Sequence, residues 1–299
     1  MRTEVEVVDK PTSDKPSGRR SGWLVARRCL QIAVLLLLAA PLLLAGWSLL
    51  GLTAPVEDVI ATPADLGIYG SLSASSIQLL ELADPYATLQ VIAASKTLEP
   101  ARLLPAGIVL VAYTLIGARA FCGWVCPVNL LLELTDWLRR RLHLPAAGTV
   151  LPRRTKIWVA AGFLVVSLLS GKLLFESISP IGAANKLLLF GSLAGTSTLV
   201  AIILAELLWS PRVWCRALCP VGGLYQLLGR LGFLRIRINH DACTRCGSCQ
   251  RACLADPVIL TPAITAQASR VIAGDCLRCG QCIDACPERA LRFGLRGLR

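Results

Sequence analysis

The residues best suited to chemistry in this 299-residue chain are its 13 cysteines, and eight of them lie in two short runs near the C-terminus. Both runs have the spacing C-x2-C-x2-C-x3-C, which supplies thiolate ligands to iron–sulfur clusters. The first run contains Cys243, Cys246, Cys249 and Cys253, and the second contains Cys276, Cys279, Cys282 and Cys286. The sequence therefore predicts two [4Fe–4S] clusters.

The same spacing predicts which cysteines bind each cluster. Three close cysteines of a run bind one cluster, and the fourth binds the cluster of the other run. Zinc fits poorly, because its four ligands usually form two separated pairs. Gly247 and Gly280 occupy equivalent positions, where the backbone must bend around an inorganic core. We predict Cys243, Cys246, Cys249 and Cys286 at the first cluster, and Cys276, Cys279, Cys282 and Cys253 at the second.

Four more cysteines form two C-x3-C-P motifs, in which Pro127 follows Cys122 and Cys126, and Pro220 follows Cys215 and Cys219. Residues 119–128 and 212–221 share Arg, Cys, Cys, Pro and Val at matching positions, which indicates an internal repeat. On a helix, a spacing of four places both thiols on one face, and the proline kinks or ends the helix after them. A parallel repeat would bring the two pairs together.

Three uses of these four thiols fit the pattern: a third cluster with one pair from each half, a dithiol/disulfide relay, or metal capture. Buried cysteine often acts only as a small apolar residue. We disfavour that interpretation, because the neighbouring Arg119 and Arg212 would lower the thiol pKa. Cys29 stands alone at the start of an apolar run, and we expect it only to pack.

The hydrophobic fraction of 55% is high for an ordinary soluble protein and predicts a membrane part. Crossing a bilayer takes about 20 apolar residues. The predicted fold class is mainly α, a four-helix transmembrane bundle with a two-fold internal repeat followed by a small α+β two-cluster domain. The expected spans are 29–52, 102–121, 156–176 and 187–209. The expected divisions are a disordered leader at 1–21, a membrane domain at 22–234 and a cluster domain at 235–299.

Basic residues predict the orientation of these spans. Lys and Arg flank spans on one side, whereas the loop 53–100 carries six acids and only one lysine, Lys96. We therefore expect a protein of the bacterial inner membrane, in contact with its lipid, with both termini in the reducing cytoplasm. The net charge of +12 lies beside apolar segments, so we do not expect nucleic-acid binding.

Smaller elements are also predicted. In the loop 53–100, a candidate docking surface, Ile77 to Leu82 and Thr88 to Ala94 resemble short helices. Val128 to Leu144 has the pattern of an amphipathic helix at a membrane interface. In the cluster domain, Arg235 to Ile238 alternates like a strand, and we expect it to pair with Leu291 to Phe293.

Ionisable residues near the C-x3-C-P motifs are candidates for a proton path. They are Glu133, Asp136 and His143 after the first motif, and Glu206 in the fourth expected span. The structural alternative is that Glu133 and Asp136 form the wetted face of an interfacial helix, while Glu206 pairs with an arginine.

Together these features resemble the membrane ferredoxin-type subunits of quinol dehydrogenases, the NapH family of periplasmic nitrate reductase systems with its relative MauN of methylamine utilisation. The resemblance rests on the Arg19-Arg20 leader, Asp84-Pro85 in the outer loop, both C-x3-C-P motifs and the paired cluster motifs. It implies a subunit that takes electrons from quinol and passes them toward a periplasmic iron–sulfur or cytochrome partner.

A second class of function fits the same residues. A maturation factor for a periplasmic redox enzyme, of the methylamine-utilisation type, would use cluster electrons and C-x3-C-P thiols on its client. A structural anchor with inactive clusters fits less well, because all eight cluster ligands are intact. The sequence decides neither between the first two classes nor the direction of electron flow.

Overall fold

The computed structural model describes residues 22–49, 68–70, 74–77, 80–144, 151–190 and 195–296. The expected leader 1–21 and the first part of the expected loop, 53–67, lie outside the described residues.

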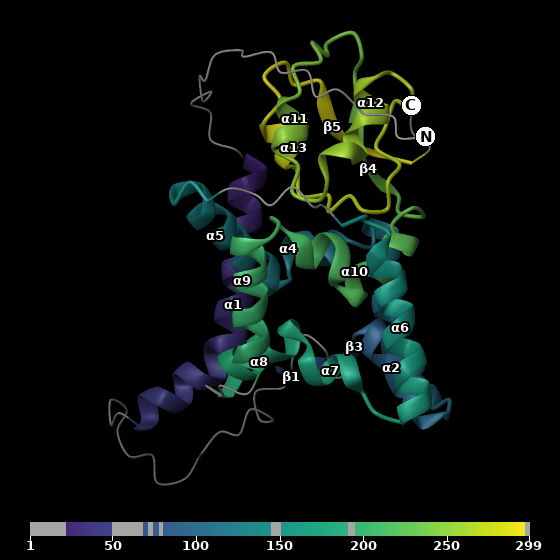
Figure 1. Ribbon diagram of the computed structural model, residues 1–299. Coiled ribbons are helices and arrows are strands. Elements are labelled where there is room, and N and C mark those ends of the chain that lie inside the picture. The colour runs from purple at the N-terminus through teal and green to yellow at the C-terminus, as the bar shows by residue number, and fades with distance from the viewer. Residues whose placement is uncertain are drawn as a thin grey trace.

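Helices dominate the chain before the cluster motifs (Figure 1). One wall contains α1, α5 and α9, and the other contains α2 and α6. The short α4 and α10 join the walls beneath the C-terminal domain. The helices are α1 (Gly22–Leu49), α2 (Pro85–Ser95), α3 (Pro100–Ile116), α4 (Ala120–Trp124), α5 (Pro127–Arg141), α6 (Thr155–Ser170), α7 (Leu174–Ile178), α8 (Pro180–Phe190), α9 (Thr196–Leu208) and α10 (Pro220–Leu228).

The prediction of a four-helix transmembrane bundle is wrong. Over the described ranges, no helix has both the length and the apolar character needed to cross a membrane. The expected span 102–121 stops at Gly117 (φ 136°), and the span 156–176 stops at the left-handed Gly171. The span 187–209 is divided between α8 and α9. With 17 residues, α3 extends about 26 Å, less than the roughly 30 Å of hydrocarbon.

Three short strands precede α2. They are β1 (Ile68–Gly70), β2 (Ala74–Ile77) and β3 (Leu80–Ala83), and they form an antiparallel sheet in this order. The prediction of a helix at Ile77 to Leu82 is therefore wrong, whereas the helix expected at Thr88 to Ala94 is present in α2. Asp84 caps α2, because its Oδ1 accepts the backbone N–H of Tyr86 at 3.0 Å.

The C-terminal domain is built on two antiparallel strands, β4 (Leu234–Ile238) and β5 (Leu291–Leu295). The predicted pairing is confirmed, with Ile236 opposite Phe293 and Ile238 opposite Leu291. Four short helical segments pack around the strands. They are α11 (Ser248–Arg251), the 3-10 turn η3 (Pro257–Leu260), α12 (Thr261–Ile264) and α13 (Gln281–Asp284).

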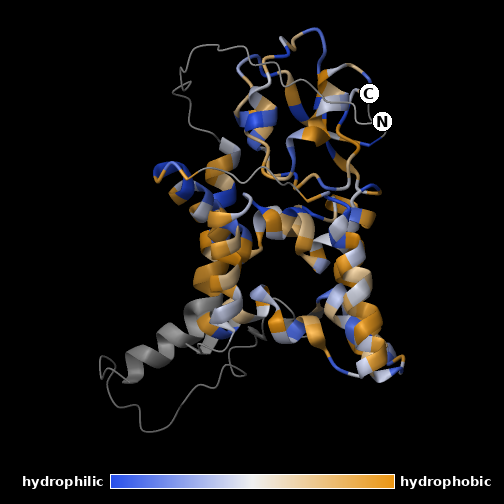
Figure 2. Cartoon of the chain, in the orientation of Figure 1, coloured by the Kyte–Doolittle hydropathy of each residue, from blue (hydrophilic) through white to orange (hydrophobic). Residues whose placement is uncertain are grey.

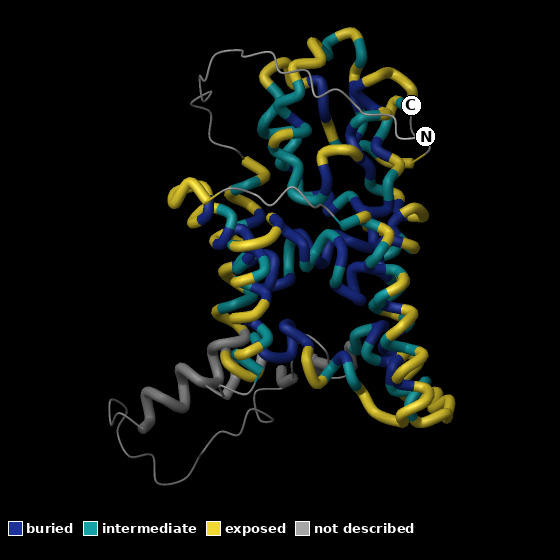
Figure 3. The backbone as a smooth tube through the Cα atoms, viewed as in Figure 1, coloured by how far each residue is buried: buried dark blue, intermediate teal, exposed yellow. Residues whose placement is uncertain are grey.

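Hydrophobic residues predominate along the helices of this part (Figure 2), and several of them are exposed. Leu104 on α3 is 70% exposed, Trp158 on α6 is 77% exposed and Leu208 on α9 is 71% exposed. Many of the buried residues of the helical part lie around α4 and α10, next to the C-terminal domain (Figure 3). The four cysteines of the C-x3-C-P motifs lie in this buried region.

Candidate metal centres

The four cysteines expected at the first cluster line one cavity. Cys243 and Cys246 come from the loop before α11, Cys249 lies in α11, and Cys286 follows α13. Ile238 of β4 and Leu291 of β5 form an apolar wall. Four thiols around one cavity with an apolar wall suit a [4Fe–4S] cluster.

The four cysteines expected at the second cluster line a separate cavity. Cys276, Cys279 and Cys282 surround it with Cys253 of the first run, so the crossed arrangement is present in the geometry. Within the described part of the chain, no three His, Cys, Asp or Glu side chains are grouped to hold a single metal ion. A cluster does not need such a group, since each thiolate binds a different iron atom.

The two cluster loops share an unusual backbone. Gly247 and Gly280 have φ values of 72° and 75°, as their positions in the motifs suggest, because glycine adopts positive φ without strain. Arg245 and Arg278 also have positive φ values, a feature that no pattern in the sequence indicated. The Arg278 guanidinium is buried and donates to the carbonyl oxygens of Leu234 at 2.7 Å and Gly229 at 2.9 Å, so it fixes the second loop to β4 and α10.

Burial raises the pKa of several of these thiols. It raises the pKa of Cys249 and of Cys279 to about 11, and that of Cys253 to about 12. Hydrogen bonding with the Ser248 hydroxyl lowers the pKa of the more exposed Cys246. The buried thiols are therefore protonated at neutral pH, and binding a cluster has to release their protons.

The C-x3-C-P motifs form turns between helices and not single helix faces. Cys122 lies in α4, and Cys215 lies in a π-helical turn, Trp214–Leu218. Cys126 and Cys219 are the N-cap residues of α5 and α10, with nearly identical φ, ψ values of −63°, 119° and −69°, 115°. Each proline is the first residue of the next helix, where its missing N–H is not needed. The repeat is thus preserved in structure.

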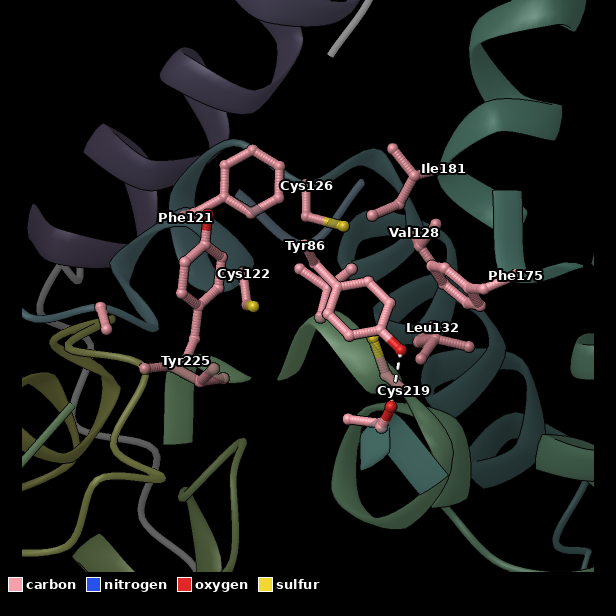
Figure 4. Packing of buried hydrophobic residues seen from close by; sticks show 14 of the residues in the cluster. Tyr86, Phe121, Cys122, Cys126, Val128, Leu132, Phe175, Ile181, Cys219 and Tyr225 are labelled. Carbon is pink, nitrogen blue, oxygen red and sulfur yellow. Dashed lines mark hydrogen bonds between the residues drawn. The ribbon is translucent and has the colours of Figure 1, made fainter. Parts of the chain in front are cut away.

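The four thiols meet in one hydrophobic core. Cys122, Cys126 and Cys219 are buried in it, and Cys215 packs against it. In Figure 4 the sulfur atom of Cys122 lies between the rings of Tyr225 and Tyr86, and the sulfur atoms of Cys126 and Cys219 are drawn near the Tyr86 ring. The convergence expected from the internal repeat is present. Cys29, expected to pack, is exposed.

Burial also dominates the pKa of these core thiols. It raises the pKa of Cys219 to about 11, against a lowering effect of Arg119 and Lys156, and it raises the pKa values of Cys126 and Cys215. The expectation that neighbouring arginines activate the thiols is therefore wrong for these three. Desolvation disfavours the thiolate more than the nearby cations favour it.

The second cluster cavity adjoins the four-thiol core. Leu277, between two of its cysteines, belongs to that core, and Cys279 packs against it. Trp124 Nε1 donates to the carbonyl of Arg278 at 3.0 Å. A Cβ on Gly123 would lie 2.8 Å from the Leu277 carbonyl oxygen, so only glycine allows this approach.

Asp275, directly before Cys276, anchors the C-terminal domain to the helices. It is 3% exposed, and its Oδ1 accepts from Arg119 Nη1 at 3.1 Å and pairs with Lys156 Nζ. Its Oδ2 accepts from Gln226 Nε2 at 2.9 Å. The buried network joins the N-cap residue of α4 (Arg119), α6 and α10 to the second cluster loop.

Arg212, which the repeat matches with Arg119, makes a second connection. Its Nε donates to Asp136 at 2.8 Å, and its Nη1 donates to the Leu254 carbonyl, next to Cys253. Glu206 is 1% exposed and accepts the backbone N–H groups of Arg212 and Trp214. Glu206 therefore shapes the turn that presents Cys215.

The other expected proton-path residues lie in one groove. Glu133, Asp136 and His143 all line it, together with Cys253, an expected cluster ligand. Glu133 is 8% exposed and pairs with Arg27 at 2.8 Å and Arg28 at 2.6 Å. It is not the solvated residue that the structural alternative expected. Glu206 does not line this groove, and its carboxyl group accepts hydrogen bonds from backbone N–H groups.

Family models match both parts of the chain. One, described as a 4Fe-4S binding domain, matches twice, at 98–145 and 192–239, and each match contains one C-x3-C-P motif. Another, described as a 4Fe-4S dicluster domain, matches 235–287. No solved structure matches the chain.

Relatives match most of the chain. The methylamine utilization ferredoxin-type protein MauN of Methylorubrum extorquens is 37% identical over 77% of this chain and 80% of its own length. MauN of Paracoccus denitrificans is 34% identical over 86% of this chain and 87% of its own length. The ferredoxin-type protein NapH of Escherichia coli is 34% identical over 74% of this chain and 78% of its own length. The chain therefore belongs to the NapH/MauN family and is a ferredoxin-type [4Fe–4S] electron-transfer protein.

Proposed function

We propose that this chain oxidises quinol and passes the electrons through its two clusters toward a periplasmic reductase or dehydrogenase system. Oxidation of one quinol to quinone releases two electrons and two protons. Two clusters that each accept one electron match this stoichiometry. The observation that carries the proposal is the position of the second cluster cavity, between the four-thiol core and the first cluster cavity.

The two cavities suit different steps of the transfer. The second is lined by Cys279 and Leu277, which contact the helical core, so it receives electrons within the protein. The first is lined by Cys246, which is exposed, so it exchanges electrons with a partner protein. The iron–sulfur or cytochrome subunit on the periplasmic side is the final acceptor, so the protein that docks at the first cluster is an intermediate carrier on the cytoplasmic side.

Protons need acceptors with a pKa near neutral. Burial raises the pKa of Glu206 to about 7, which favours it over Glu133 and Asp136, whose carboxylates are bound to arginines. His143 is exposed at the groove, in contact with water. If Glu206→Gln leaves quinol-dependent cluster reduction at the wild-type rate, Glu206 is not the acceptor.

We place the protein at the bacterial inner membrane, since quinols dissolve in lipid. The exposed apolar side chains of α3, α6 and α9 support contact with lipid. The free cysteines support a reducing environment for the cluster domain, which is the cytoplasmic side.

The test is anaerobic mixing of the iron-loaded full chain with a short-chain quinol, with the clusters followed by EPR. Quinol should reduce both clusters of the wild type. Cys279→Ser, at the second cluster, should abolish quinol-dependent reduction of the first cluster, whereas Cys246→Ser should leave the second cluster reducible by quinol. Wild-type clusters that dithionite reduces but quinol does not would exclude the proposal.

A maturation factor is the second candidate, favoured by the similarity to relatives named for methylamine utilization. The raised pKa values of Cys126, Cys215 and Cys219 oppose thiol exchange with a client, because the thiolate is the nucleophile. A client enzyme that accumulates unmodified in a deletion strain, together with clusters that quinol does not reduce, would favour maturation. A third cluster at the core thiols would raise the iron content above the roughly eight atoms of two clusters.

A further inference from the structure

An open groove of about 2140 Å³ lies between α1, α5 and the loop that follows Cys253. Its charged lining is strongly basic, with six arginines against two carboxylates. Both carboxylates are already paired, Glu133 with Arg27 and Arg28, and Asp136 with Arg212. The groove therefore carries positive charge that its own acids do not neutralise.

Arg139 is the most informative residue of this groove. It lies on α5, it is 5% exposed, and its Nη2 has no hydrogen-bond partner among the described residues. Of its neighbours in the lining, Arg212 is bound to Asp136 and Arg216 to Asp256, at 2.8 and 3.2 Å. A buried guanidinium nitrogen without a hydrogen-bond partner is costly, and an anion in the groove that accepts from Nη2 would satisfy it.

The remaining lining shows what kind of molecule carries this anion. Ile32, Leu134 and Trp137 line the same groove and are 50%, 58% and 56% exposed. Large apolar side chains thus lie beside the basic lining on α1 and α5. A free inorganic anion would leave them in water, and an acidic peptide would not cover them with hydrocarbon. The lining fits an amphiphile with an anionic head and apolar chains.

We propose that the groove binds an anionic phospholipid, with its phosphate on Arg139 and its acyl chains against Ile32, Leu134 and Trp137. The bound phosphate accepts hydrogen bonds from the guanidinium, and α5 lies along the lipid surface. The site does not depend on quinol oxidation, so its failure would leave the quinol test unaffected.

The test measures binding of the full iron-loaded chain to vesicles of phosphatidylglycerol with phosphatidylcholine, compared with phosphatidylcholine alone. Arg139→Gln should weaken binding to the anionic vesicles about tenfold or more, since charge-assisted hydrogen bonds are lost. The matched control is Arg141→Gln, on the same helix, where the arginine is exposed and does not line the groove. This control should weaken binding about fivefold at most, through surface charge alone.

Soluble probes distinguish binding of the lipid headgroup from binding of the acyl chains. Glycerol phosphate should compete only weakly, and inorganic phosphate should not compete. Leu134→Gln, a change at an exposed position that the fold tolerates, should weaken vesicle binding without changing binding of glycerol phosphate. Equal losses of affinity for the anionic vesicles in Arg139→Gln and Arg141→Gln would overturn the proposal. An unchanged vesicle affinity in Leu134→Gln would overturn it too. Tight binding of an acidic peptide that displaces the vesicles would overturn it as well.

Discussion

Glu206 shows how one buried carboxyl group connects the fold to the thiols. Its oxygens accept two backbone N–H groups in the turn before Cys215, yet burial is the largest influence on it and raises its pKa to about 7. In the folded protein the group is therefore protonated up to nearly neutral pH. In the unfolded chain it would lose its proton near its ordinary pKa of 4.5.

This difference in pKa makes the free energy of unfolding depend on pH. Because the folded state holds the proton more tightly, the stabilisation is complete below about pH 4.5 and is lost as the pH rises through about 7. The free energy of unfolding should fall across this window, by up to about 1.4 kcal/mol per pH unit. Glu206→Gln keeps an acceptor oxygen and should remove this dependence.

Urea unfolding followed by circular dichroism between about pH 5 and 7 checks this prediction. The control is Glu99→Gln, because Glu99 is an exposed acid that pairs with Arg102 at 2.8 Å. That variant should keep the wild-type pH slope. An unchanged slope in Glu206→Gln would mean that the buried carboxyl is ionised in the fold.

At the scale of elements, Asp275 joins the second cluster loop to three helical elements. Replacing it by Asn leaves Arg119 and Lys156 buried without their carboxylate. Breaking a buried ion pair from one side costs about 3–5 kcal/mol. We therefore expect Asp275→Asn to destabilise the chain by this amount.

Denaturant unfolding of iron-loaded protein measures the effect. Asp241→Asn is the matched control, since Asp241 is an exposed acid in the same domain, and it should change the free energy of unfolding by less than about 0.5 kcal/mol. Similar effects of the two substitutions would show that the Asp275 network adds nothing to the docking of the domain.

Elements with local signals could be predicted from the sequence. The cluster spacing placed four cysteines at each of two cavities, and the alternation at Arg235 to Ile238 indicated a strand whose pairing is correct. The internal repeat indicated that two thiol pairs meet. In each case, residues close in sequence carried the information.

Other features could not be predicted from the sequence, because they depend on single residues or on contacts between distant segments. The apolar run at 102–121 hides Gly117, where φ of 136° ends α3, and a hydropathy window averages over such a residue. The partners of Glu133, namely Arg27, Arg28 and Arg212, come from distant segments, so no local pattern shows that the carboxylate is buried and paired. The thiol pKa values depend on burial, which only the assembled core determines.

At the scale of the whole molecule, the two parts differ in what holds them together. The helical part has a continuous core that includes Tyr86, Phe121, Leu132 and Phe175. The C-terminal domain has a smaller core, in which two paired strands are joined by short helical segments, and the two pockets lined by the cluster cysteines lie beside this core. Two strands alone are marginally stable in water, so we infer that the clusters complete the core of this domain.

Removing iron should therefore unfold the C-terminal domain before the helical part. In limited proteolysis with identification of fragments by mass spectrometry, iron-free protein should be cut first between residues 239 and 290, while a fragment containing 85–228 persists. Iron-loaded protein should resist cleavage in both regions, because cluster binding contributes folding free energy to the domain that holds the ligands.

Equal cleavage of the C-terminal domain with and without iron would show that the strands and the Asp275 network hold it folded alone. Cleavage that begins in the helical part would instead place the weaker core there, against the packing of Tyr86 and Phe175.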